Sequence, residues 1–214
     1  MTDLPDDSIP QGRRDFFRKA LFKALRPAAD YLEKKLPPAL RNLADASDVA
    51  ERLVVLRPPG ARRESEFLET CFRCGSCADH CPADSISLLK TADERMKGTP
   101  YVDASLRACV ICNDLSCMKV CPSGALQLVD RLDIRMGFAL VDHETCVRSK
   151  GEDCTICVEV CPIGKEAIRV GVDGRIEVID PSCTGVGCTG CGLCQERCPT
   201  RPVRAIVVRP YSTR

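Results

Sequence analysis

Sixteen of the seventeen cysteines in this chain fall into four groups of four, and a Cys-Pro pair closes each group. The groups span residues 71–81, 109–121, 146–161 and 188–198, so their closing cysteines recur every 37 to 40 residues. A single Cys-Pro pair is typical of an ordinary turn, whereas four copies at near-constant spacing indicate an internal structural repeat. The chain is therefore limited to folds that assemble four similar units around their cysteines.

The spacing within the groups is typical of iron–sulfur ligation. The first and fourth groups read Cys-x2-Cys-x2-Cys-x3-Cys-Pro, the run of bacterial two-cluster ferredoxins in which the fourth cysteine ligates the partner cluster. The second group has a longer loop before its third cysteine, and the third has an insertion after its first. We therefore predict four [4Fe–4S] clusters, with sixteen iron ligands: Cys71, Cys74, Cys77, Cys81, Cys109, Cys112, Cys117, Cys121, Cys146, Cys154, Cys157, Cys161, Cys188, Cys191, Cys194 and Cys198.

The seventeenth cysteine, Cys183, is either a spare thiol or a substitute for Cys188 as first ligand of the fourth group. Cys188 is preferred, because it restores the undistorted spacing of the first group.

Zinc is the competing metal, but three cysteines within seven residues crowd one tetrahedral ion and suit a cube. Only two histidines, His80 and His143, are present to complete a mixed zinc site.

The predicted fold class is α+β, built as tandem bacterial-ferredoxin-like modules in two pairs, with a helical N-terminal extension. Each unit is expected to contain a short strand, a cysteine loop, a short helix after Cys-Pro, and a second strand. The strand-like segments are Ile86–Leu89, Ala125–Val129, Phe138–Asp142, Ala167–Val170, Arg175–Asp180 and Ala205–Val208. Because Arg57-Pro58-Pro59-Gly60 interrupts the chain, we expect a basic amphipathic extension over 1–56 and a four-cluster domain over 57–214.

Composition narrows the class of function. Only 4% of the residues are aromatic and none is Trp, so burial of side chains alone cannot easily offset the entropy of the chain. A net charge of +1 gives no case for nucleic-acid binding, and no apolar run is long enough to span a membrane. No phosphate loop or catalytic constellation stands outside the cysteine groups, which predicts an electron carrier without its own small-molecule substrate site.

From about Arg57 onward the sequence resembles the NapG/MauM family of ferredoxin-type proteins. Stretches outside the ligand loops carry this resemblance: Arg57-Pro-Pro-Gly60, Glu66-Phe-Leu-Glu-Thr-Cys71-x-Arg-Cys-Gly75, Gly98-Thr-Pro-Tyr101, Cys121-Pro-Ser-Gly-Ala-Leu126, Arg135-Met-Gly137, Ala139-Leu-Val-Asp142 and Cys188-Thr-Gly-Cys-Gly192. The resemblance implies four clusters ligated by the sixteen cysteines and a relay of electrons between redox proteins. The implied partners are a quinol-linked membrane protein and an acceptor reductase.

Three readings remain for the function and two for the cluster order. The chain is either an independent carrier or the electron-transfer subunit of a soluble oxidoreductase complex, with a structural zinc protein as the unfavoured third reading. By analogy with four-cluster subunits of related oxidoreductases, the first group pairs with the fourth and the second with the third. Sequential pairing is equally compatible with the lengths of the linkers.

The N-terminal segment carries an apolar stripe among basic residues, including Phe17, Leu21 and Leu25, and Pro27 kinks or ends its first helix. Residues 13–36 are expected to pack on the protein's own body, with peripheral membrane contact or partner docking as alternatives. Arg13-Arg14 is similar to the start of a twin-arginine export signal, but no apolar stretch follows. We therefore expect a location in the cytoplasm or at the cytoplasmic membrane face, with the periplasm as alternative.

Overall fold

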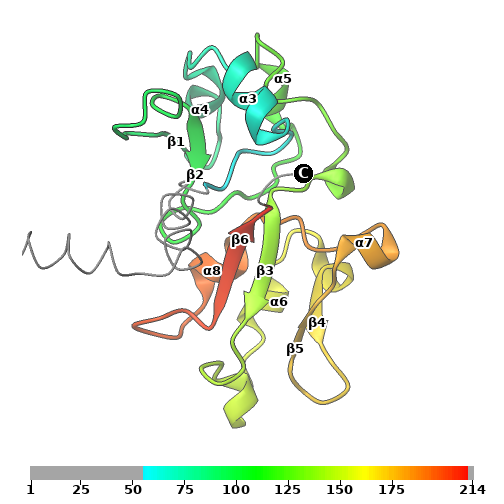
Figure 1. Cartoon of the computed structure of the whole chain (residues 1–214). Helices are drawn as coiled ribbons and strands as arrows, with labels where there is room; N and C mark the ends of the chain where they lie inside the picture. The colour runs from blue at the N-terminus through cyan, green and yellow to red at the C-terminus, as the bar shows by residue number, and fades with distance from the viewer. Residues whose placement is uncertain (1–54, 212–214) are drawn as a thin grey trace, which may run out of the picture. The chain divides into compact units, whose positions relative to one another are not determined.

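Short elements separated by turns make up the described part of the chain, because cysteine loops and prolines interrupt every run of regular backbone (Figure 1). The computed structural model describes residues 55–211, which belong to one compact unit beginning at Val54. The extension expected over 1–56, with its basic stripe at 13–36, lies outside the described residues except for its last two positions.

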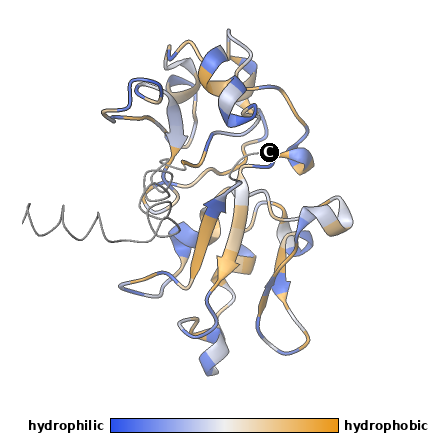
Figure 2. Cartoon of the chain, viewed as in Figure 1, coloured by the Kyte–Doolittle hydropathy of each residue, from blue (hydrophilic) through white to orange (hydrophobic). Residues whose placement is uncertain are grey.

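Three two-stranded antiparallel sheets are present within residues 55–211. β1 (Ile86–Leu88) pairs with β2 (Pro100–Val102), and β4 (Ile168–Val170) pairs with β5 (Ile176–Val178). The longest pair joins β3 (Gly137–Val141) to β6 (Ile206–Pro210), with Ala139 opposite Val208. Figure 2 shows that apolar residues follow β3 and β6, the pair that crosses the centre of the second half of the described chain.

The helices are one or two turns long. The α-helices are α3 (Glu64–Thr70), α4 (Ser76–Asp79), α5 (Ser116–Lys119), α6 (Ile156–Glu159), α7 (Pro181–Thr184) and α8 (Leu193–Arg197). Three 3₁₀ turns, η1 (Arg131–Asp133), η2 (Arg148–Lys150) and η3 (Gly164–Glu166), complete the set in this part of the chain. None of the helices within residues 55–211 has the length and hydropathy of a membrane span.

The expected helix after each Cys-Pro pair is wrong in position. In all four groups the helical turn instead carries the third cysteine and ends before the fourth, as α4 does at Asp79 ahead of Cys81. The proline provides the physical reason, since the residue before a proline is disfavoured in the α region. The closing cysteine therefore leaves the helix, and turns follow it, with the 3₁₀ turn η3 after Cys161 in the third group.

The strand predictions hold for five of the six segments, at least over their central residues. The exception is Ala125–Val129, which forms only an isolated bridge between Leu126 and Ala61. Leu128 in that segment is 63% exposed, so its apolar alternation does not correspond to a buried strand face. The sequence analysis also missed β2 and α3, which supply the packing around the first cysteine group.

The core is small and unusually rich in sulfur. Phe67, Ile111 and Ile134 are the largest apolar side chains that are almost completely buried in the described chain. Five cysteines join the buried set: Cys77, Cys117, Cys191, Cys194 and Cys198. The interior of this unit is therefore organised around thiols as much as around hydrocarbon.

Candidate metal centres

Four cavities, each lined by four cysteine side chains, lie within the described unit. Site A is lined by Cys71, Cys74, Cys77 and Cys121, and site B by Cys81, Cys109, Cys112 and Cys117. Site C is lined by Cys161, Cys188, Cys191 and Cys194, and site D by Cys146, Cys154, Cys157 and Cys198. All sixteen predicted ligands are thus brought into four equivalent sets. Cys183 is exposed on α7 and lines none of the four cavities, whereas Cys188 lines site C.

The fourth cysteine of each group is exchanged with a neighbouring group. Cys81, from the first group, lines site B, and Cys121, from the second group, lines site A. Cys161 and Cys198 are exchanged between sites C and D in the same way. The groups therefore pair sequentially, and the pairing of first with fourth and second with third that the analogy suggested is not the arrangement observed.

The cavities are nearly equal in size. Each contains about 320 to 360 Å³ of space free of protein atoms, part of which is continuous with solvent. The thiols border this space instead of converging on one point, and no three Cys, His, Asp or Glu side chains within residues 55–211 are placed to hold a single metal ion. Four thiols around a cavity of this kind fit a cluster, whose irons each take one thiolate.

A left-handed residue positions the helical turn that carries the third cysteine in three of the four sites. Gly75, Leu115 and Gly192 have φ values of 80°, 49° and 92°, and each lies two residues before that cysteine. This conformation costs a residue with a side chain roughly 1–2 kcal/mol, which explains glycine in sites A and C. At site B, Leu115 adopts it despite its side chain, as strained residues at functional sites often do.

Backbone N–H groups in two of the loops point toward the first cysteine of the group. The amides of Arg73 and Ile111 lie 3.4 Å and 3.5 Å from the sulfurs of Cys71 and Cys109. Both residues have positive φ, and this turn of the chain directs their N–H groups inward. Hydrogen bonds of this kind stabilise a thiolate and influence the potential of a bound cluster.

Burial dominates the electrostatics of the thiols. It raises the pKa of Cys109 to about 12, a shift to which the neighbouring Cys191 and Cys117 thiols also contribute. The pKa of Cys117 likewise rises to about 12, and burial raises the pKa of Cys77, Cys157 and Cys191 to about 11. Thiols in this state ionise only when positive charge compensates them, and iron supplies that charge on binding.

Three ligands depart from this trend because hydroxyl and amide donors surround them. The Ser76 hydroxyl, 3.4 Å from the sulfur, lowers the pKa of Cys74. Burial acts to raise the pKa of Cys121, but the Leu126 amide and the Ser123 hydroxyl outweigh it and lower the value. The pKa of Cys198 is lowered against the effect of burial in the same way, by Thr200 and the amides of Ala205 and Ile206.

Thr200 is also the buried hydroxyl for which the described residues supply no hydrogen bond of ordinary geometry. It lines site D together with Cys198, the cysteine whose pKa it helps to lower. The sequence analysis missed these hydroxyls. A signal for them exists, because Ser76, Ser123 and Thr200 each follow a cysteine ligand by two residues.

The turn before site D is fixed by an acidic residue at the end of β3. The Asp142 carboxylate accepts hydrogen bonds from the Thr145 hydroxyl at 2.8 Å and the Glu144 amide at 2.9 Å, and these bonds lower its pKa. Its carbonyl accepts the N–H of Cys146 at 3.0 Å. Asp142 therefore places the first cysteine of the third group at the rim of site D.

Comparisons with known proteins agree with this chemistry. Residues 70–125 match the family of 4Fe-4S dicluster domains. The chain is 44% identical over 156 residues to the methylamine utilization ferredoxin-type protein MauM of Methylobacillus flagellatus, which covers 70% of this chain and 66% of that protein. Identity to MauM of Methylorubrum extorquens is 46%, covering 75% of this chain and 74% of that protein. The ferredoxin-type protein NapG of Escherichia coli is 41% identical, covering 74% and 72%.

Proposed function

Because the chain belongs to the MauM and NapG family of ferredoxin-type electron-transfer proteins, we propose that it relays single electrons through four [4Fe–4S] clusters, one at each of sites A to D. The observation that carries this proposal is the exchange of the fourth cysteine between sites A and B and again between sites C and D. Exchanged ligands bring paired clusters close together, as in two-cluster ferredoxins.

The protein's own groups have separate tasks in this relay. The cysteine thiolates hold the irons, and the loop amides and hydroxyls stabilise the negative charge that collects on the sulfurs. A bound cluster supplies reversible one-electron chemistry. With every iron of a site taken by a cysteine, no coordination position is left for a substrate, so the chain acts as a carrier and not as an enzyme.

The partners proposed for this relay are a quinol-linked membrane protein as donor and a reductase or other redox enzyme as acceptor. This part of the proposal rests on the family relationship. The alternative, an electron-transfer subunit held permanently in an oxidoreductase complex, uses the same four sites.

The test is the content of iron and acid-labile sulfide per chain, measured on full-length protein purified without oxygen. Four clusters require about sixteen of each. A value near eight would mean that only one pair, or half of the sites, is filled, and would refute the four-cluster relay. Little iron with stoichiometric zinc would refute electron transfer altogether.

A further inference from the structure

Sites B and C belong to different pairs, yet their loops are joined by a backbone hydrogen bond. The N–H of Cys109, a cysteine of site B, donates to the carbonyl of Cys191, a cysteine of site C, at 3.0 Å. The two ligands are thus connected through their own backbones and one hydrogen bond. None of the hydrogen bonds found within residues 55–211 joins a cysteine of site A to a cysteine of site D.

Glu196 of α8 holds the two loops together next to this bond. Its carboxylate accepts the N–H of Ala108 at 2.6 Å, and Ala108 directly precedes Cys109. The same carboxylate lies 3.6 Å from Arg197 and its side chain is 22% exposed. Because the acceptor is charged and mostly shielded, this hydrogen bond is stronger than an ordinary amide pair.

Two further contacts hold the loops at close range. The buried Gln195 donates from Nε2 to the Ser105 hydroxyl at 2.9 Å while its Oε1 accepts the N–H of Val208 at 2.7 Å. At Gly192, an added Cβ would lie 2.5 Å from the Cβ of Ala104, a distance that real side chains do not reach. Glycine at this position therefore lets the loop of site C approach the segment before site B.

We propose that electrons cross between the two cluster pairs at this junction of Cys109 with Cys191, and that Glu196 is the positioning residue that holds it closed. The order of the relay is then A, B, C, D, and the outer sites A and D exchange electrons with the partners. In the crossing step one electron leaves site B as one enters site C, or the reverse, and no bond or proton is transferred. The inference rests on the proposed function and specifies its path.

The repeat provides a matched control for Glu196. Glu159 occupies the equivalent position in α6, because each of these acidic residues lies two positions after the third cysteine of its group. The Glu159 carboxylate, however, accepts the hydroxyl of Thr155 in its own loop. Glu159→Ala therefore removes an equivalent side chain without touching the junction, whereas Glu196→Gln keeps an acceptor for the Ala108 amide.

The experiment compares the full-length holoprotein with Glu196→Ala, Glu196→Gln and Glu159→Ala, after iron analysis has shown the same cluster content in each. A ruthenium photoreductant is attached to the exposed Cys183, which lies on α7 just before the loop of site C. Continuous illumination injects electrons, and integrated EPR of rapidly frozen samples counts reduced clusters over time. Hydrogen exchange of the peptide covering residues 104–109 reports separately on closure of the junction.

In the native chain we expect all four clusters to be reduced in one phase. In Glu196→Ala, sites C and D should be reduced first and sites A and B in a separate, later phase, because opening of the junction slows the crossing from site C to site B. Exchange at 104–109 should accelerate in this variant alone, and Glu196→Gln should restore the single phase.

A single phase in Glu196→Ala despite faster exchange would overturn the junction and leave the four-cluster relay intact. The junction would also be overturned if reduction of sites A and B were delayed as much in Glu159→Ala as in Glu196→Ala. A native chain with fewer than four clusters would instead overturn the proposed function. The proposed electron path would then be overturned with it.

Discussion

Hydroxyl groups beside the cysteine ligands distinguish individual sites at the scale of single residues. Ser76 and Ser123 contact two different ligands of site A, and Thr200 lies against a ligand of site D. A donor to a ligand sulfur stabilises the reduced state of a cluster more than the oxidised state, because the reduced state carries more negative charge. The Ser76 and Ser123 hydroxyls are therefore expected to raise the reduction potential of site A.

Replacing Ser76 by Ala tests this effect on a side chain that is not itself a ligand. Loss of one hydrogen bond of about 1 kcal/mol lowers the reduction potential of site A on the order of tens of millivolts. EPR-monitored redox titration of the holoprotein measures this shift. Ser87→Ala, at an exposed serine of β1, should leave every potential unchanged. An unchanged or raised potential in Ser76→Ala would contradict the role assigned to the hydroxyl.

The residues that line the sites could be predicted from sequence because their spacing is a local property of each loop. The site to which each fourth cysteine contributes could not be predicted from sequence. Pairing of the first group with the second and pairing of the first with the fourth are both compatible with the same spacing. Arg57 was missed for a related reason. It was interpreted as part of a break between segments, yet its side chain is buried and contacts residues more than forty positions away. Only the folded chain brings such contacts together.

Arg57 links the start of the unit to α3 and β2 at the scale of elements. Its guanidinium donates to both carboxylate oxygens of Glu64, at 2.9 and 2.5 Å, and to the hydroxyl of Thr99 at 2.9 Å. It also donates to the carbonyl of Pro100 and lies 4.7 Å from the centre of the Phe67 ring. Because Phe67 and Pro100 line site A, this one side chain supports the wall of that site.

Arg57→Lys should weaken site A selectively. An ammonium group cannot reproduce the planar fork that reaches Glu64, Thr99 and Pro100 together, so at least one buried polar group loses its partner. The expected cost is on the order of 2 kcal/mol. The first measurement is the temperature at which the visible absorption of the clusters bleaches, which should be lower in the variant. The second is the amount of iron released in the first step of heating, which should correspond to one cluster.

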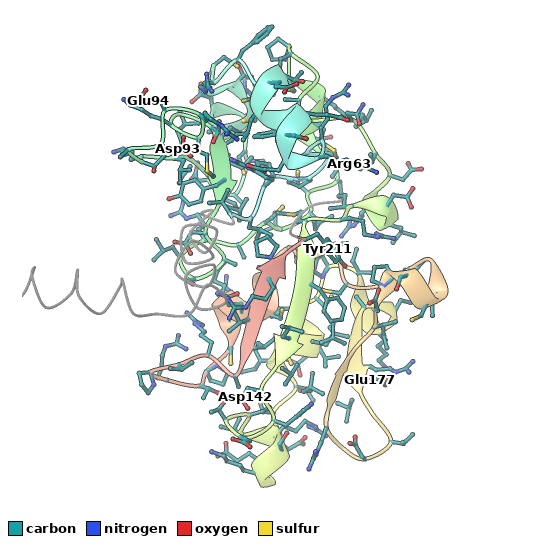
Figure 3. All side chains as sticks on the ribbon, in the orientation of Figure 1. Arg63, Asp93, Glu94, Asp142, Glu177 and Tyr211 are labelled. Atoms are coloured by element: carbon teal, nitrogen blue, oxygen red, sulfur yellow. The ribbon has the colours of Figure 1, made fainter. Side chains whose placement is uncertain are left out.

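Arg63→Lys is the matched control for this change, because Arg63 is an exposed arginine that directly precedes α3, the helix that contains Glu64 (Figure 3). The clusters of Arg63→Lys should bleach at the same temperature as those of the native protein. Equal effects of the two substitutions would show that a general change in charge, and not the buried fork of Arg57, is responsible.

The described unit is built from helices and sheets that are too short to be stable on their own. Its α-helices within residues 55–211 are four to seven residues long, and isolated helices shorter than about 12 residues are marginal in water. Its sheets are two-stranded, and such pairs have little stability of their own. The buried thiols therefore take the place that large apolar side chains occupy in other small domains.

Removal of the metal should consequently unfold the chain beyond Cys71. Thiolate sites rarely exist in an unfolded chain, so the free energy of cluster binding is also free energy of folding. Treatment with an iron chelator under oxidising conditions, followed by reduction of the thiols, should abolish the far-ultraviolet circular dichroism of the strands and the cooperative thermal transition. Anaerobic reconstitution with iron and sulfide should restore both signals together. A metal-free chain that still melts cooperatively, with slow hydrogen exchange at β3 and β6, would show that hydrocarbon packing alone suffices and would remove the clusters from the account of this fold.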